Sequence, residues 1–397
     1  MNTLLPNAHI RHVAAKRTEG DAAHRVLTAE SFATAQQEIT AWDGYAPTPL
    51  VSLSAIASQI GVGEILYKDE GPRFGLGSFK ALGGSYAALR VLQREISKRL
   101  GKDVSLADIR NGVYADACAA ITLVSATDGN HGRSLAWGCK RFGVPCRIYI
   151  HAEVSEGRAK AMRDLGAEVV RIDGDYDESV VVSKTEAEKN GWFVVSDTSW
   201  PGYSLPPCDV MSGYGVMVQE ISDALDQAPT HVFLQGGVGG LAAGVIAALR
   251  QYWGDASPRA IIVEPELAAC LFESSKTGAA TKVDIAEETL MAGLSCGEPS
   301  GLAWEILAEE ATDYLTIPEA LVAPTVRLLA NPIGSDTAIE AGESAVAGLA
   351  ALITAMGDTS LADKLGLTST SRVLLIGSEG VTDQAIFDMI MQGNEAA

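Results

Sequence analysis

The sequence predicts an α/β protein of two domains, each with a mainly parallel, twisted sheet flanked by helices. Its 397 residues exceed the roughly 100 to 200 residues of one ordinary domain. Apolar, β-branched runs alternate with helical periods and glycine stops, which is typical of βαβ units. Two such blocks are separated by residues 196–215, rich in proline, glycine and serine. We expect a larger domain over 1–87 and 200–397, and a small mobile domain over 88–199.

The first block follows a stretch, residues 1–40, that carries few signals and is predicted to be an irregular or helical arm. The block itself predicts strand, helix, strand, helix and strand over residues 147–150, 155–165, 168–172, 176–189 and 192–196. Gly166 and the pair Asn190-Gly191 end the two helices, because these residues readily adopt the left-handed conformation that closes a helix.

The second block predicts a strand over 231–235, a helix over 241–253 and a strand over 259–263, with a last short strand over 373–376. Residues 232–249 form eighteen uncharged residues, the length at which a membrane span becomes a candidate. Five glycines interrupt this run where a strand should turn into a helix. We therefore interpret it as a strand, a turn and a helix of a soluble protein.

Charge and cysteine content exclude several classes of partner. Lys and Arg number 30 against 50 Asp and Glu, a net charge of −20 that would repel a phosphate backbone or an anionic membrane. The six cysteines show no CxxC pair and no metal-ligand spacing, and the N-terminus does not resemble a secretory signal. We expect a cytoplasmic protein that acts on a small molecule, with no nucleic acid, membrane or metal as a partner.

The first chemical motif lies in residues 71–92, where a glycine-rich turn leads to Lys80 and then to a helical pattern. Lys80 is the lone cation of an apolar, glycine-lined stretch. Desolvation there would lower the pKa of its amine and make it a nucleophile able to form a Schiff base. The alternative is an ordinary lysine at a helix start, with its ammonium in solvent.

The second motif is a polar cluster, residues 127–132, between a strand-like run and a helix. At such a turn Asp128 and Asn130 would face a ligand lying over the start of the helix. The alternative is structural: Asp128 would only cap the helix, and His131 would be a hydrogen-bonding residue of the fold.

The third motif is a glycine loop after strand 231–235, composed of Gly236, Gly237, Val238, Gly239 and Gly240. Successive unhindered N–H groups at a helix start predict a phosphate site. A dinucleotide site is a competing interpretation, because the loop also fits the G-x-G-x-x-G/A pattern and Glu264 ends the next strand, where an acid could bind a ribose. A purely structural role in helix packing is the third possibility.

Together these motifs resemble a known family. GSFKALGG, ATDGNHG and GGVGG in this order, with SEG near the end, are similar to the fold-type-II pyridoxal-phosphate enzymes, which include tryptophan synthase β and the serine and threonine dehydratases. The resemblance runs from about Pro47 to the C-terminus. Within the group, four segments are most similar to the enzymes that release ammonia from 2,3-diaminopropionate: KDEGPRFGLGSFKALGGSYA, TDGNHGRSLAWGC, VVSDTSWPGY and MAGLSCGEPSGLAWEIL.

The resemblance implies a role for each motif. Lys80 would be joined covalently to pyridoxal 5'-phosphate, and Asn130 would contact the 3-hydroxyl of its ring. The loop Gly236, Gly237, Val238, Gly239 and Gly240 would hold the phosphate. Ser378 would face the pyridine nitrogen, although Glu379 follows it before the next glycine, which leaves open which side chain reaches that nitrogen.

Two acids distinguish the possible reactions. Asp128 stands where related dehydratases commonly have a small or hydroxylated residue, and Asp197 in SDTSW is a second acid. A substrate with two amino groups brings an extra cation, which carboxylates would bind. The resemblance implies that Asp128 removes the α-proton of the D isomer, that Lys80 removes that of the L isomer, and that Asp197 positions the substrate. Asp197 could instead cap loop N–H groups.

We therefore expect a homodimeric enzyme of amino-acid catabolism that converts D- or L-2,3-diaminopropionate to pyruvate and two ammonia by α,β-elimination. A threonine or serine dehydratase of the same fold is the first alternative. An NAD-binding oxidoreductase would use the glycine loop but leave Lys80 and Asn130 unexplained. A sensor that keeps the fold without catalysis is the third.

Overall fold

The computed structural model describes residues 4–127, 129–174 and 176–393. The chain forms two compact units. Unit 1 comprises Met1–Ala29, Pro47–Ser78 and Met217–Ala397, and unit 2 comprises Glu30–Ala46 and Phe79–Val216.

A seven-stranded sheet forms the centre of unit 1. Its strands are, in spatial order, β1 (Arg11–Ala14), β10 (Asp313–Ile317), β9 (Arg259–Pro265), β8 (His231–Gln235), β11 (Arg372–Gly377), β3 (Glu64–Asp69) and β2 (Leu50–Ser52). Neighbours from β10 to β3 run parallel, whereas β1 and β2 pair antiparallel at the two edges. The carboxyl ends of the parallel strands therefore meet at one edge of the sheet, where ligand sites of such proteins lie.

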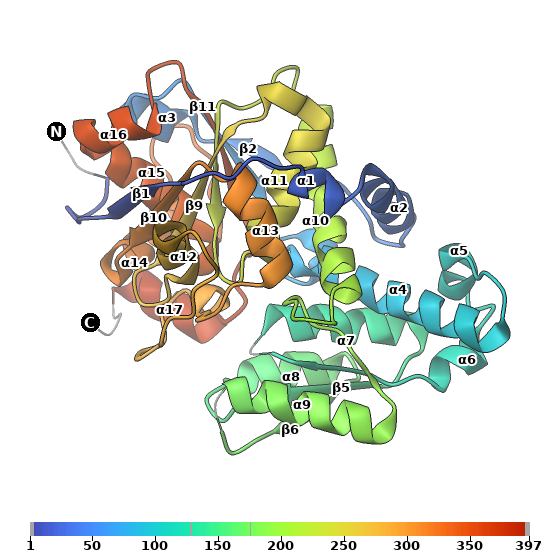
Figure 1. Cartoon of the computed structure of the whole chain (residues 1–397). Helices are drawn as coiled ribbons and strands as arrows, with labels where there is room; N and C mark the ends of the chain where they lie inside the picture. Colours follow the sequence, from blue (N-terminus) through green and yellow to red (C-terminus); the bar gives the residue numbers. More distant parts are fainter. Residues whose placement is uncertain (1–3, 128, 175, 394–397) are drawn as a thin grey trace. The chain divides into compact units, whose positions relative to one another are not determined.

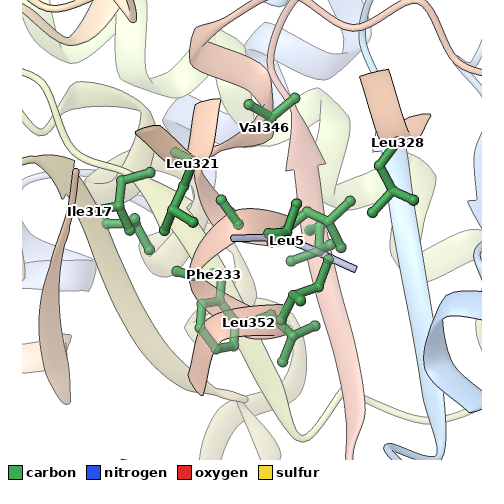
Figure 2. Packing of buried hydrophobic residues seen from close by; sticks show 14 of the residues in the cluster. Leu5, Phe233, Ile317, Leu321, Leu328, Val346 and Leu352 are labelled. Atoms are coloured by element: carbon green, nitrogen blue, oxygen red, sulfur yellow. The ribbon is translucent and has the colours of Figure 1, made fainter. Parts of the chain in front are cut away.

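The core of unit 1 forms where α15 (Ala347–Gly357) packs against β8, β9 and β10. All five residues of β8 and of β10 are buried, as expected for central strands covered on both faces. Figure 2 shows side chains from distant segments meeting in this cluster, among them Leu5, Phe233, Ile317, Leu321, Leu328, Val346 and Leu352.

Short helices and 3-10 turns complete unit 1. They are α1 (Ala22–Arg25), α3 (Ser54–Ile60), η1 (Arg73–Gly75), α11 (Gly240–Trp253), η2 (Gly254–Ala256), α12 (Cys270–Thr277), η3 (Ala292–Leu294), α13 (Gly301–Glu310), η4 (Glu319–Leu321), α14 (Val322–Ala330), η5 (Ser344–Val346), α16 (Thr359–Leu365) and α17 (Gln384–Gln392). The long helix α10 (Leu205–Ala224) contributes residues to both units.

Unit 2 has a four-stranded, fully parallel sheet with the order β6 (Glu168–Arg171), β5 (Cys146–Ile150), β4 (Leu123–Ala126) and β7 (Phe193–Val194). Figure 1 shows α8 and α9 alongside β5 and β6. The helices of this unit are α2 (Ala29–Ile39), α4 (Lys80–Leu100), α5 (Leu106–Arg110), α6 (Ala115–Ala119), α7 (Asn130–Phe142), α8 (Glu156–Asp164) and α9 (Tyr176–Asn190). The α/β class and the mainly parallel sheets predicted from the sequence are confirmed.

The uncharged run 232–249 consists of most of β8, the glycine loop and the first part of α11, as predicted. Across the described residues, no single helix is long and apolar enough to cross a membrane. One pair bent by 119°, Ser344–Gly357 with Thr359–Leu365, passes on length and composition alone.

The prediction of an irregular or helical arm over residues 1–40 is wrong at β1, which adds an antiparallel edge to β10. Only Val13 and Ala14 of its four residues are apolar, and neither end is buried. Such a strand gains its stability from hydrogen bonds to an edge that already exists, and that edge leaves no periodic signal in residues 11–14 themselves.

We predicted a large cofactor-binding domain over 1–87 and 200–397 and a small mobile domain over 88–199. This division by function and mobility stays a prediction. The compact units have different bounds, since residues 79–87 and 200–216 belong to unit 2. One reason is α4, which runs without interruption from Lys80 to Leu100 and would be cut by a boundary after residue 87.

Candidate active site

Lys80 is the first residue of α4, and its Nζ lies 2.5 Å from Oδ2 of Asp197. The two residues are 117 positions apart, and both belong to unit 2. Their side chains are only 22% and 17% exposed. Because water is partly excluded there, the ammonium and carboxylate attract each other more strongly than in bulk solvent. The structure thus brings together two of the three residues predicted to act in catalysis.

Opposing effects set the charge of Asp197. Burial raises the pKa of this carboxyl group, but the Lys80 ammonium and then His131 lower it by more, so the pKa of Asp197 lies well below its ordinary value. Asp197 is therefore ionised at neutral pH. It can bind a cation, either the ammonium of Lys80 or an ammonium group of a substrate.

His131, the second residue of α7, is a candidate that the sequence analysis treated only as a structural alternative. Its Nε2 lies 2.9 Å from the carbonyl oxygen of Val195, and because a carbonyl only accepts, Nε2 carries the hydrogen. Nδ1 lies 3.9 Å from Oδ2 of Asp197 and has no hydrogen-bond partner within the described ranges. This buried ring, with Nε2 fixed and Nδ1 turned toward Asp197, can orient the carboxylate.

Tyr214 on α10 is a second candidate, which the sequence analysis missed. Its ring packs on that of Phe79 at 4.7 Å between centroids and lies against Gly83, one helical turn after Lys80. Its hydroxyl is buried, without a hydrogen-bond partner in the part of the chain that the structure describes. Burial raises the pKa of Tyr214 well above its ordinary value, while Lys80 opposes the rise and Asp197 adds to it. Both charged groups therefore lie near this hydroxyl.

The start of α7 carries the second motif. Asn130 is the first residue of the helix, and Thr127 Oγ1 accepts hydrogen bonds from the N–H groups of Gly129 at 3.2 Å and Gly132 at 3.3 Å. Thr127 thus satisfies two N–H groups near the start of α7, whose N-cap residue, Gly129, has no side chain to do so. Asp128, the predicted base, lies outside the described residues.

Hydrogen bonds between α4 and α7 fix the start of α4. Ser134 Oγ donates to the carbonyl oxygen of Lys80 at 2.6 Å and accepts from the N–H of Ser85 at 3.1 Å. Ser85 Oγ in turn donates to the carbonyl oxygen of Ser134 at 2.7 Å. The backbone that carries Lys80 is therefore held by the same helix that carries Asn130 and His131.

The glycine loop lies in unit 1, between β8 and α11. Gly237 and Gly239 have φ values of 61° and 95°, in the left-handed region that favours glycine. The N–H of Gly239 donates to the carbonyl oxygen of Gly236 at 3.1 Å, and Val238 accepts from the N–H of Ser300 at 2.9 Å. The loop is thus a defined turn at the N-terminus of α11.

This turn fits a phosphate group. The first N–H groups of any α-helix lack acceptors within the helix, and the helix dipole favours an anion at that end. A Cβ at Gly239 would lie 3.0 Å from Leu307 and 3.1 Å from Ala303, so the turn leaves no room for a side chain there. Consecutive backbone N–H groups in such a turn can form a nest of donors for an anion.

Glu264 does not occupy the place that a ribose-binding acid would need. Its side chain is fully buried, and its two carboxyl oxygens accept hydrogen bonds from the N–H groups of Leu271 at 2.9 Å and Phe272 at 2.7 Å. The expectation that Glu264 could bind a ribose is therefore wrong, because its hydrogen-bonding capacity is used inside the fold. This observation argues against the dinucleotide alternative.

Ser378 follows β11 directly and is buried. The neighbouring Glu379 is committed elsewhere, since its Oε1 accepts from the N–H of Ser344 at 3.1 Å and its backbone pairs with Ser78 in an isolated bridge. Of the two side chains that the sequence left open, Ser378 is therefore the better candidate to face a pyridine nitrogen. Ser378 and the glycine loop follow β11 and β8, which are neighbouring strands of the sheet in unit 1.

The comparisons with known proteins agree on one family. Residues 41–378 match the model described as "Pyridoxal-phosphate dependent enzyme". The diaminopropionate ammonia-lyase of Escherichia coli strain K12 is 37% identical over 360 residues, covering 89% of each chain.

Solved structures of the Escherichia coli enzyme are similar over the whole chain. The selenomethionine holo form has a TM-score of 0.90 at 34% identity and covers 98% of each chain. The complex with an aminoacrylate–pyridoxal-phosphate azomethine reaction intermediate has a TM-score of 0.86, with the same identity and coverage.

Proposed function

The chain belongs to the pyridoxal-phosphate dependent enzymes, and from this premise we propose that it converts 2,3-diaminopropionate, as the D or the L isomer, to pyruvate and two ammonia by α,β-elimination. The observation that carries the proposal is the contact between Lys80 and Asp197 beside His131. It supplies an amine for the cofactor and an ionised carboxylate for a substrate with two amino groups.

The residues present fit pyridoxal phosphate. We propose that Lys80 is its point of covalent attachment, that Asn130 contacts the ring hydroxyl, that the loop 236–240 holds the phosphate, and that Ser378 faces the pyridine nitrogen. When bound, the cofactor withdraws electron density from the α-carbon of an amino acid and so stabilises the charge left when the α-proton is removed. The positive φ values at Gly237 and Gly239 and the start of α11 support the phosphate assignment.

We assign proton transfer to Lys80 and Asp128. The Lys80 amine removes the α-proton of the L isomer once its own proton has gone, and Asp128 removes that of the D isomer. Asp197 binds the substrate's ammonium group, because a carboxylate with a depressed pKa keeps its charge in a partly enclosed site. Nδ1 of His131 faces Oδ2 of Asp197 at 3.9 Å, and His131 thereby helps to orient that carboxylate toward the substrate.

The decisive experiment compares substrates on the purified protein. We expect D- or L-2,3-diaminopropionate to be consumed with release of pyruvate and ammonia, and threonine and serine to be much poorer substrates. Good turnover of threonine with inert diaminopropionate would instead establish a dehydratase. Cofactor absorbance followed by borohydride reduction should label the peptide that carries Lys80. The Lys80→Ala variant should lose both the label and the activity.

Two other interpretations are tested by the same material. Binding of a nicotinamide nucleotide by a colourless protein would favour an oxidoreductase, and intact ligand binding with unchanged biology in Lys80→Ala would favour a sensor. Assembly as a homodimer and a cytoplasmic location stay predictions, which measurement of the mass in solution and cell fractionation will check.

A further inference from the structure

A fully buried carboxyl group lies directly behind the glycine loop. Glu264, near the end of β9, is so close to Gly236 that a Cβ added to this glycine would lie 2.4 Å from Cγ of Glu264 and 3.1 Å from its Cδ. Strand β9 pairs with β8 in parallel, with Val263 beside Gln235. The residues that follow these two positions, Glu264 and Gly236, are therefore also neighbours. Any movement of the Glu264 side chain would therefore displace Gly236, the first residue of the loop.

The same carboxyl group begins α12. Its two oxygens take the N–H groups of Leu271 and Phe272, which the helix itself cannot satisfy. The thiol of Cys270 lies 3.7 Å from Glu264 Oε1 and 3.5 Å from the carbonyl oxygen of Gly237. The start of α12 is thus connected to two successive residues of the loop. The Glu264 side chain contacts Gly236, and the Cys270 thiol contacts Gly237.

We propose that Glu264 is a positioning residue for the phosphate group of the cofactor, acting through the glycine loop that it holds against the start of α12. The inference rests on the proposed function, in which this loop binds the phosphate. Glu264 itself makes no contact with the ligand. It holds the peptide groups that do, so that their N–H groups keep one orientation when the ligand is absent.

Charge adds a second effect. Burial raises the pKa of Glu264 to about 8, even though the N–H groups of Leu271 and Phe272 favour the ionised form. Among the described residues, the titratable and charged groups that act on it are Cys270 on α12, Arg11 on β1 and Tyr314 on β10. Above pH 8 an anion therefore forms behind the phosphate-binding turn and weakens binding of the phosphate dianion.

Asp336 provides a matched control in the same unit. It is also a buried carboxylate at a helix start, accepting from the N–H groups of Ala55 at 2.8 Å and Ile56 at 3.1 Å. It caps α3 rather than α12, and no residue of the glycine loop is among its hydrogen-bond partners. Removing the Asp336 carboxylate therefore removes the cap of α3 and leaves the contacts of the glycine loop unchanged.

The test measures affinity for pyridoxal phosphate, the ³¹P resonance of the bound phosphate and the melting temperature of each protein. We expect Glu264→Ala to weaken cofactor binding by about tenfold, because the glycine loop loses the side chain that holds its N–H groups in one orientation, and to shift the ³¹P resonance. We expect Glu264→Ala and Asp336→Ala to lower the melting temperature by similar amounts, since each removes a helix cap. In Asp336→Ala the dissociation constant for pyridoxal phosphate should stay within about twofold of the wild-type value. Equal effects of the two variants on cofactor affinity would overturn the proposal.

Glu264→Gln keeps the volume of the side chain and cannot ionise, so it tests the charge effect even where the alanine variant fails to fold. Wild-type affinity for pyridoxal phosphate should fall between pH 7 and 9 relative to this variant, and parallel pH profiles would contradict the charge effect. If the wild-type protein binds no pyridoxal phosphate, the proposed function fails. If wild type and Glu264→Ala bind it equally well, only the role of Glu264 fails.

Discussion

At the scale of single residues, the candidate site depends on groups whose charge or hydrogen bonding is incomplete without a ligand. Asp197 is ionised because Lys80 lies beside it, and His131 and Tyr214 each present a buried polar atom that no described residue satisfies. Buried polar atoms are nearly always paired in folded proteins. Two such atoms near one lysine therefore indicate a place where a ligand supplies the missing partner.

Asp197→Asn should lower kcat/KM for diaminopropionate by about a hundredfold, because the amide cannot hold the charge that balances Lys80 or the substrate's ammonium. Glu168→Gln, which breaks the exposed ion pair with Arg147, should leave the activity unchanged. Steady-state kinetics of both variants check this. Equal activity of Asp197→Asn and wild type would remove Asp197 from the site.

The pH dependence of stability gives an independent check on Asp197. Its pKa is depressed in the folded protein, so its ionised form stabilises the native state at neutral pH. That contribution is lost as the pH falls below the ordinary aspartate value of about 3.9 toward the folded-state pKa. In acid denaturation monitored by circular dichroism, Asp197→Asn should lack this part of the pH dependence.

Tyr214→Phe should separate function from stability. The hydroxyl has no partner among the described residues, so its removal should leave the free energy of unfolding unchanged or raise it by up to about 1 kcal/mol. If the hydroxyl serves the reaction at Lys80, kcat should fall by about tenfold or more. Tyr149→Phe removes another buried hydroxyl that has no hydrogen-bond partner among the described residues, and this change should leave kcat unchanged. Unaltered kcat in Tyr214→Phe would leave this residue with a packing role only.

At the scale of elements, a buried cluster of four charges joins β3, η1 and α10 within unit 1. Lys68 and Arg73 each contact Glu220, at 2.5 Å and 2.7 Å, and Arg73 also contacts Glu70 at 2.8 Å. All four side chains are almost inaccessible to solvent. The charges balance within the cluster, which therefore holds in place the segment that leads toward the Lys80 motif.

Glu220→Gln should destabilise the protein by about 3 to 5 kcal/mol, because two buried cations would then share one carboxylate. Burial raises the pKa of Glu220, but Arg73 and Lys68 lower it by more, so the stabilising charge is present at neutral pH and lost in acid. Asp164→Asn, in the exposed pair with Lys160, should cost less than about 1 kcal/mol. Denaturant titration compares the two variants, and similar losses would show that the cluster contributes little.

At the scale of the whole molecule, each unit has its own sheet, and Lys80 and the glycine loop belong to different units. The helix start that carries Lys80 and the turn formed by the glycine loop exist only in the folded chain, so a cofactor bound as proposed binds only the native state. Its binding energy is therefore added to the stability of the native state.

Removing pyridoxal phosphate should therefore lower the melting temperature, and adding it back at about a hundred times its dissociation constant should restore about 2.7 kcal/mol of stability. Differential scanning calorimetry with and without the cofactor measures this. Pyridoxal without phosphate should restore less, since it cannot use the glycine loop. Equal stabilisation by both compounds would contradict the assignment of the loop.

Local sequence patterns predicted part of the fold. The strand, glycine turn and helix over residues 231–253 were predicted to within a residue or two, because apolar periodicity and glycine turns act over a few residues. Strands β1, β2, β3 and β10 were not predicted. In β1 the apolar residues are too few, and the strand becomes recognisable only through its pairing with β10.

The sequence by itself determined the α/β class, the order of elements in the two βαβ blocks and the motifs around Lys80 and Gly236, since backbone preference and hydrophobic period are properties of neighbouring residues. Only the tertiary structure decided that Asp197 meets Lys80 across 117 positions, that His131 and Tyr214 lie beside them, and that Glu264 is a buried helix cap. Burial and long-range contact set the charge and the partners of a side chain, and neither is written in its own segment of sequence.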